Sequence, residues 1–272
     1  MFSRADRLLS HAHLSKQVVH FGWEGFEPCL TIYDHDSGEL KDLPPGDPMM
    51  VSVERRCIGR LDRGYRPCPH DAPVSKFSQC PSCASVWIPH LECIFEPRCQ
   101  GELCDSRICS RPHTVYVAFT GEVVKVGMTG SHRLRERGVE QGADAIAPLE
   151  ELPNRYQARE EEKRITRKVG AVQGLDRRKA AAHLFRPLPR EAVEERYLNI
   201  LDGLEIPHTP ELTFLDGYPV REMECPPVPV KTPGEHRGEY LGAKGRFMVY
   251  GDTDHPRMLD LSDLVSRFLL LL

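Results

Sequence analysis

Eight of the ten cysteines lie close together in the sequence, and this clustering limits what the chain can fold into. They are Cys57, Cys68, Cys80, Cys83, Cys93, Cys99, Cys104 and Cys109, whereas Cys29 and Cys225 are isolated. The segment 56–112 also contains seven prolines and few apolar repeats, so it can build little hydrophobic core of its own. We therefore expect bound metal to hold this segment together.

The compartment expected from the sequence agrees with metal ligation. The first residues contain no apolar run of the ~7–15 residues that a secretory signal needs, so we expect a cytoplasmic protein. Thiols are kept reduced in that compartment, which favours metal ligands over disulfides. The most apolar run, Leu264 to Leu272, contains Arg267 and is far shorter than the ~20 residues of a membrane span. We expect it to be a last buried element, and we expect no membrane partner.

The cysteine spacing predicts two structural metal sites. Cys80-Pro-Ser-Cys83 is a knuckle that supplies two ligands from one tight turn, and Cys57 and Cys68 complete a first four-thiolate set. Cys93, Cys99, Cys104 and Cys109 form a second set, with His90 or His113 as substitutes. Zinc is the expected ion at both sites, and an iron–sulfur cluster is the alternative. A site with four protein ligands has no open position for a substrate, so we expect both sites to be structural.

The remaining patterns predict an α+β protein of four segments. Residues 1–55 form an N-terminal β unit, 56–112 the cysteine-rich zinc module, 113–190 an α/β core, and 191–272 a helix, a proline-rich connection and a β segment. Within the core, two apolar runs around a short turn predict a hairpin buried on both faces. A helix is expected after Ser131, a second from about Asn154 to Val169, and a third from Arg190 to Leu201.

Charge separates along the chain. The whole sequence has 36 Lys or Arg and 40 Asp or Glu, a formal charge of −4, which excludes a uniformly basic nucleic-acid-binding protein. Residues 113–190 nevertheless hold 15 Lys or Arg against 10 Asp or Glu. This local excess is compatible with phosphate contacts, although a solvated helix surface explains the Arg177-Arg178-Lys179 run equally well.

Three polar residues of the core lie where packing alone would not place them. Tyr116 and Lys125 fall within the apolar hairpin, and a lysine is rarely buried without a partner. Glu162 follows Ala158 by four positions and precedes Ile165 by three, so it lies on the apolar stripe of its helix. Such a carboxylate is either in a buried ion pair, with Lys125 or an arginine, or a metal ligand.

At these residues the sequence resembles the GIY-YIG nuclease superfamily. Thr114-Val115-Tyr116 stands where that superfamily has Gly-Ile-Tyr, and Lys125-Val126-Gly127 stands for Tyr-Ile-Gly. Residues 23–270 are also similar to an uncharacterised cysteine-rich family that embeds such a domain. That similarity rests on Cys57-Ile-Gly59, Gln79-Cys-Pro-Ser-Cys83, His113 to Ala118, Lys125 to Thr129, Gln141-Gly-Ala143 and Gly242 to Tyr250.

The resemblance implies a GIY-YIG-like core and a mechanism of phosphodiester cleavage. Glu162 would bind Mg²⁺ or Mn²⁺, Arg137 would stabilise charge on the phosphate, and Tyr116 would help to activate water. Lys125, in place of the second tyrosine, would lower the phenol pKa or contact the phosphate. Arg133 and Arg135 are alternatives to Arg137. The chain departs from the superfamily pattern at Thr114, Lys125 and Gly138.

These residues and the resemblance are compatible with three functions. The first is divalent-metal-dependent phosphodiester hydrolysis on nucleic acid by a zinc-containing GIY-YIG-like protein. The second is a noncatalytic adaptor that binds nucleic acid or a ribonucleoprotein. The third is an enzyme that uses the same residues on a small molecule in specialised metabolism.

Overall fold

The chain forms two compact units. The structure is a computed structural model that describes residues 14–62, 64–84, 93, 96–102, 107–172, 177–207 and 209–272. One unit contains Met1–Ser85 together with Tyr218–Leu272, and the other contains Val86–Gly217. Both ends of the chain thus contribute to the first unit, which differs from the four consecutive segments expected from the sequence.

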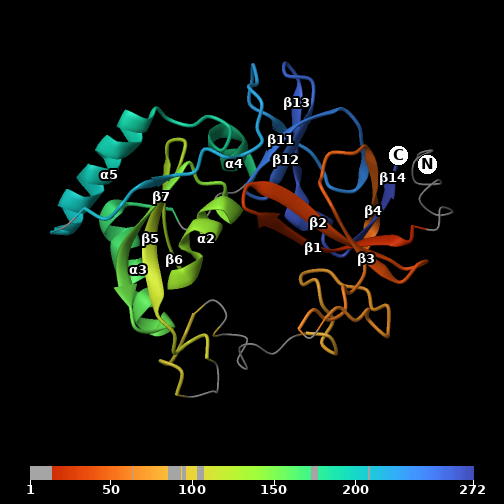
Figure 1. Ribbon diagram of the computed structural model, residues 1–272, viewed down its shortest axis with the longest axis horizontal. Helices are drawn as coiled ribbons and strands as arrows, with labels where there is room; N and C mark the ends of the chain where they lie inside the picture. Colours follow the sequence, from red (N-terminus) through yellow and green to blue (C-terminus); the bar gives the residue numbers. More distant parts are fainter. Residues whose placement is uncertain are drawn as a thin grey trace. The chain divides into compact units, whose positions relative to one another are not determined.

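The first unit contains two sheets (Figure 1): one combines red and orange strands from the start of the chain with blue strands from its end, and the other is blue throughout. The six-stranded sheet has the order β10-β4-β14-β1-β2-β3, and every pairing in it is antiparallel. The four-stranded sheet has the order β11-β12-β13-β9, in which β9 runs parallel to β13. The strands are β1 (Lys16–Glu24), β2 (Glu27–Asp34), β3 (Glu39–Leu43), β4 (Met49–Arg55), β9 (Val228–Pro229), β10 (Gly234–His236), β11 (Glu239–Lys244), β12 (Phe247–Gly251), β13 (Pro256–Asp260) and β14 (Arg267–Leu271).

The apolar C-terminal run explains why the two ends of the chain share a unit. It forms β14, which pairs with both β1 and β4 after the 3-10 helix η3 (Leu261–Leu264). Leu269 of β14 packs in one core with Val18, Val51 and Leu259, which come from both sheets. The expected last element is present, but it is buried only in part, since Leu269 is buried whereas Leu270 is 41% exposed. Its pairing with distant strands depends on contacts that no local pattern encodes.

The second unit is an antiparallel sheet with helices on both faces. The strand order is β6-β5-β7-β8. The strands are β5 (His113–Thr120), β6 (Val123–Gly130), β7 (Ala145–Leu152) and β8 (Thr213–Phe214). The helices are η2 (Ser131–Arg133), α2 (Leu134–Gln141), α3 (Arg155–Val169), α4 (Arg177–His183) and α5 (Arg190–Leu204). No helix in the described part of the chain has the length and apolar character needed to span a membrane.

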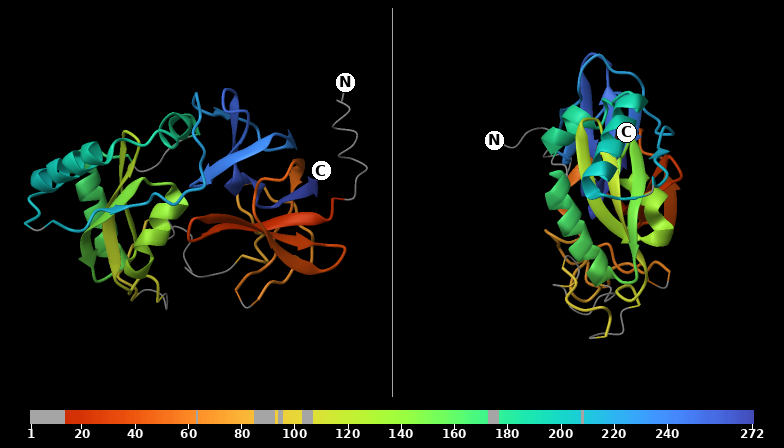
Figure 2. Two further views of the ribbon diagram at one scale, coloured as in Figure 1. Left: turned by 45° about the horizontal axis from the view of Figure 1, so that its top comes forward. Right: turned by 90° about the vertical axis from the view of Figure 1, so that its left-hand side faces the viewer.

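Alternation along β5 assigns its side chains to two faces. Val115, Val117 and Phe119 share one core with residues of α3 and α5. Because successive side chains of a strand point to opposite faces, Tyr116 points to the other side of the sheet. The right-hand view of Figure 2 shows α2 and α3 on opposite sides of the strands. The sheet therefore separates an apolar core on the α3 side from the α2 side, where Tyr116 lies.

The expected local elements are present, with two corrections. The Asn154 side chain accepts a hydrogen bond from the Gln157 N–H, and Gly170 ends α3 in the left-handed conformation, as the sequence predicts. Ser131 does not cap its helix, because the chain first makes the 3-10 turn η2 and α2 begins at Leu134 without a side-chain cap. The hairpin is buried on both faces only in β5, since β6 is an edge strand and half-exposed.

Candidate functional site

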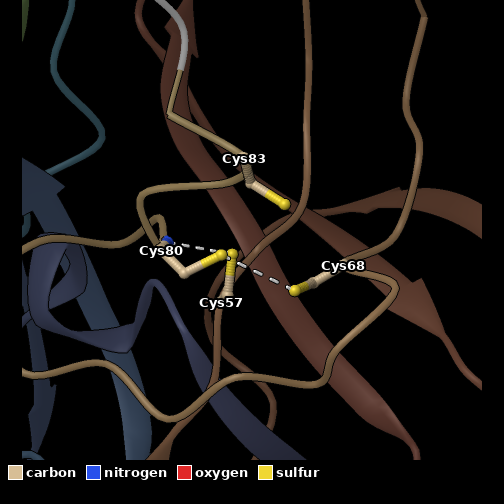
Figure 3. A group of neighbouring side chains, drawn as sticks. All are labelled: Cys57, Cys68, Cys80 and Cys83. Atoms are coloured by element: carbon tan, nitrogen blue, oxygen red, sulfur yellow. Dashed lines mark hydrogen bonds between the residues drawn. The ribbon is translucent and has the colours of Figure 1, made fainter.

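Four cysteine sulfurs of the first unit converge on one point. The Sγ atoms of Cys57, Cys68, Cys80 and Cys83 all lie within 4.8 Å of one another, and those of Cys68 and Cys80 are 3.9 Å apart. Figure 3 shows the four side chains pointing toward a common centre. Tetrahedral zinc with bonds of about 2.3 Å to sulfur places its ligands roughly 3.8 Å apart. The group has the chemistry and spacing of a four-thiolate metal site.

Backbone hydrogen bonds position the thiols of this group. The Cys83 and Ala84 N–H groups both donate to the Cys80 carbonyl and close the knuckle turn, at 3.0 and 2.9 Å. The N–H groups of Gly59 and Cys80 donate to the Cys57 sulfur at 3.4 and 3.2 Å. Gly59 has a φ of +78°, and a Cβ there would lie 2.1 Å from a backbone oxygen, so this turn requires glycine.

The electrostatics of the four thiols favour a bound cation. Burial and the neighbouring thiols raise the pKa of Cys83 to about 12, and burial also raises the pKa of Cys57. Although burial opposes it, hydrogen bonds from the Ala72 and His70 backbones lower the pKa of Cys68 to about 7. Loss of the proton from Cys57 or Cys83 is thus disfavoured without positive charge in the centre, which a bound metal ion would supply.

A buried hydroxyl beside the group also fits metal-bound thiolates. The Tyr65 hydroxyl is buried and has no hydrogen-bond partner among the described residues. Burial raises its pKa, and so do the charges of Tyr33, Cys57, Cys68 and Cys83. Metal-bound thiolates accept hydrogen bonds, and such outer partners orient the ligands. The first expected set of ligands therefore fits a metal such as zinc.

The second expected site remains a prediction. Cys104 and His90 lie outside the described residues, while Cys93, Cys99 and Cys109 are buried. Arg155, at the start of α3, contacts the first and the last cysteine of this second set. Its guanidinium donates to the Cys93 carbonyl at 2.5 Å, and its backbone N–H donates to the Cys109 carbonyl at 2.9 Å. Within the described part of the chain, the Cys57 group is the one set of three or more metal ligands that converges.

Tyr116 lies at the centre of a polar group on the α2 side of the second unit. It is 1% exposed and pairs with Gly127 across the β5–β6 ladder. A Cβ on Gly127 would lie 2.5 Å from the Tyr116 hydroxyl oxygen, so glycine is what lets the ring lie over β6. The Gln141 amide of α2 donates to that oxygen at 2.8 Å. Burial raises the Tyr116 pKa, whereas Arg137 and Gln141 oppose the rise.

One cationic side chain, Arg137, adjoins this phenol, and a second, Lys125, lies near Arg137. Lys125 is half-buried on β6, and burial, with a smaller contribution from Arg137, lowers its pKa to about 8 against the opposing effect of Glu162. Burial tends to lower the pKa of Arg137, but the nearby Tyr116 and Glu140 raise it. Arg137 also forms an ion pair with Glu140 at 3.0 Å. Arg135 is exposed, and Arg133 pairs with Glu136 and Glu140, so Arg137 is the arginine of this helix that acts on Tyr116.

Glu162 lies on the other helix layer and has an ion-pair partner. It is 7% exposed on α3, and its Oε2 accepts a hydrogen bond from Arg159 at 2.9 Å. Arg159 also pairs with Glu96, at 3.1 Å. The Glu162 charge still acts on both Tyr116 and Lys125, whose pKa values it raises. Of the two expected environments, a buried ion pair with an arginine is the one observed.

Two residues of this group were missed in the sequence. Gln141 belongs to a noted motif, but nothing in its spacing showed that it reaches Tyr116. Arg159 precedes Glu162 by three positions, and this i, i+3 spacing of opposite charges is a signal that could have identified the pair. The neighbouring carboxylates Glu160 and Glu161 pair on the helix surface with Lys163 and Arg164.

Comparison with known proteins adds a family match to this geometry. Residues 52–186 match the family model "Protein of unknown function (DUF2797)". The matched range contains the four cysteines that converge. It also contains β5, β6, α2 and α3, which carry all the residues described around Tyr116. Neither a curated protein nor a solved structure matches the chain.

Proposed function

We propose that the second unit binds the phosphate backbone of nucleic acid on its α2 side and hydrolyses a phosphodiester bond there. The observation that carries the proposal is the place of the Arg137 guanidinium on α2, which lies against the Tyr116 phenol of β5 and also acts on the Lys125 amine of β6. The excess of Lys and Arg in residues 113–190 supports a polyanionic substrate.

The environments of Tyr116 and Lys125 support an assignment of acid and base. Burial raises the Tyr116 pKa, so its hydroxyl keeps its proton near neutral pH. The Lys125 pKa of about 8 leaves a useful fraction of neutral amine. Lys125 would take the proton of the attacking water, whose oxygen bonds to phosphorus, and Tyr116 would donate its proton to the leaving oxygen. Arg137 would stabilise the charge that develops on the phosphate.

Glu162 is the residue that would hold a divalent cation in this proposal. One of its oxygens accepts from Arg159, and the other offers the kind of ligand that Mg²⁺ prefers. Mg²⁺ commonly binds one or two carboxylates and completes its shell with water and substrate phosphate, so a single glutamate suffices. When bound, the ion would add positive charge near Tyr116 and Lys125, on which the Glu162 charge already acts, and would so help to neutralise the phosphate.

The Arg159–Glu162 ion pair favours a second candidate function. A carboxylate neutralised by arginine is a poorer cation ligand, and the cationic side chains Lys125 and Arg137 can bind a phosphate without metal. This arrangement suits noncatalytic binding of nucleic acid. Binding without cleavage would assign this second function.

Cleavage of single-stranded and duplex DNA and RNA with Mg²⁺ or Mn²⁺ tests the first proposal. Tyr116→Phe and Glu162→Gln should each lower the rate by about 100-fold or more, because each removes a group that acts in the transition state. Two matched controls should retain the rate: Tyr197→Phe, whose hydroxyl instead donates to the Pro210 carbonyl, and Glu160→Gln on the surface of α3. Intact substrates after long incubation would contradict hydrolysis.

The rate of cleavage is expected to rise with pH up to about 8 and then to level off. Below its lowered pKa, Lys125 carries the proton that it must lose to act as a base. Lys125→Arg keeps the charge but does not deprotonate, so it should abolish cleavage and preserve binding. A rate that is flat between pH 6 and 9 in the wild type, or an active Lys125→Arg variant, would remove Lys125 from the role of base.

A further inference from the structure

A groove lies beside the four-cysteine group of the first unit. Its volume is about 420 Å³, and residues 73–77 and 79–81 line it. Cys80, one of the four converging cysteines, is among them. The lining residues lie between Cys68 and Cys83 in the sequence, so a metal held by the four thiolates would also fix the walls of the groove. The groove is therefore a defined surface of the folded module.

The groove presents an exposed aromatic ring. Phe77 is 62% exposed, although burial of a phenylalanine is favourable by about 1.5–3 kcal/mol where a core can take it. The Lys76 ammonium lies 5.5 Å from the centre of this ring. The Phe77 ring offers a flat apolar surface, and the Lys76 ammonium places a positive charge close to it. This combination suits a planar, negatively charged ligand.

Two arginines are hydrogen-bonded to the segment that lines the groove or to the residue next to it. The Arg55 guanidinium donates to the Ser75 carbonyl at 2.6 Å, and that of Arg60 donates to the Ser82 carbonyl. Among the described residues neither arginine, nor Lys76, has a carboxylate partner, whereas Arg56 and Arg66 do. Residues 55–84 hold six Lys or Arg against two Asp, in a chain whose formal charge is −4.

We infer that this groove binds single-stranded nucleic acid, with one base stacked on Phe77 and the adjoining phosphates near Lys76, Arg55 and Arg60. Stacking on a protein side chain requires a base that is free of its own duplex, so a single strand is the ligand that the exposed ring selects. Cationic side chains without acidic partners supply the complementary charge for the backbone. The inference concerns the first unit alone and does not depend on hydrolysis in the second.

Fluorescence anisotropy with the full-length, zinc-loaded protein tests the base contact. The probes are a labelled 12-nucleotide single strand, as DNA and as RNA, and the duplex of the same sequence, without added Mg²⁺ or Mn²⁺. Phe77→Ala should weaken single-strand binding by about 5- to 100-fold, the usual effect of losing one stacked base. Val53 is a matched control, because it is 66% exposed in the same unit and does not line the groove. Val53→Ala should bind as the wild type does.

A second pair of variants tests the charge. Lys76→Gln should lower the affinity and reduce the slope of log affinity against log salt by about one, as expected for one lost phosphate contact. Arg66→Gln, which removes an arginine paired with Asp62, should change both much less. Zinc content measured on every variant separates a lost contact from a lost fold. Unchanged single-strand affinity in Phe77→Ala and Lys76→Gln, an equal loss of duplex affinity in Phe77→Ala, or binding to neither probe would overturn the inference.

Discussion

Replacing Cys80 with serine is expected to release the metal from the four-cysteine group and to unfold the segment that carries it. A serine hydroxyl is a poor ligand for zinc, and only three thiolates remain. Apparent binding free energies of structural zinc are about 10–16 kcal/mol, so the loss of one of four ligands, about a quarter of this, should lower the affinity by roughly 10²- to 10³-fold. Metal analysis of the purified variant measures the loss directly.

Unfolding should follow metal release, because the hydrophobic contacts of the segment are few. Cys57, Cys80 and Cys83 form a small cluster of their own, packed by Cys68, Ala72 and Val74. Rapid proteolysis within residues 57–84 is expected in Cys80→Ser, and also in the wild type after chelation. Cys29→Ser and Cys225→Ser are matched controls, since both thiols are only half-buried and lie outside the group. A Cys80→Ser variant that holds as much zinc per chain as the wild type and resists protease would show that the group is not a metal site.

The cysteine site could be predicted from sequence because its ligands come from adjacent turns. The Cys80-Pro-Ser-Cys83 knuckle is closed by hydrogen bonds within five residues, so spacing alone describes its geometry. Helix α3 was predictable for the same reason, since Asn154 and Gly170 mark its ends through local contacts. Elements of this kind carry their structural signal in neighbouring residues.

The arrangement around Tyr116 and the composition of the first unit could not be predicted in this way. The partner of Tyr116, Gln141, lies on another element, and its approach is fixed by how α2 packs on the sheet. The place of β14 between β1 and β4 likewise depends on pairing between the two ends of the chain. Periodicity assigns each residue to a face of its own element, and it does not say which elements meet.

Gly127→Ala is expected to displace Tyr116 and to lower both stability and activity. The new Cβ would lie 2.5 Å from the Tyr116 hydroxyl oxygen and 2.7 Å from the ring carbon that bears it, distances that real Cβ atoms do not adopt. The ring must move, and the hydrogen bond from Gln141 is then lost. Overpacking of this kind costs about 1–3 kcal/mol of the free energy of unfolding, which chemical denaturation measures.

Two further variants separate this collision from the general effect of adding a methyl group. Gly203 is exposed in α5 and a Cβ there meets nothing within 4 Å, so Gly203→Ala should be neutral or stabilising by about 0.5–1 kcal/mol. In a Tyr116→Phe background the atom nearest to the new Cβ is absent, so Gly127→Ala should cost less there than in the wild type. Strict additivity of the two substitutions would contradict direct contact between residues 116 and 127, because only residues that interact deviate from it.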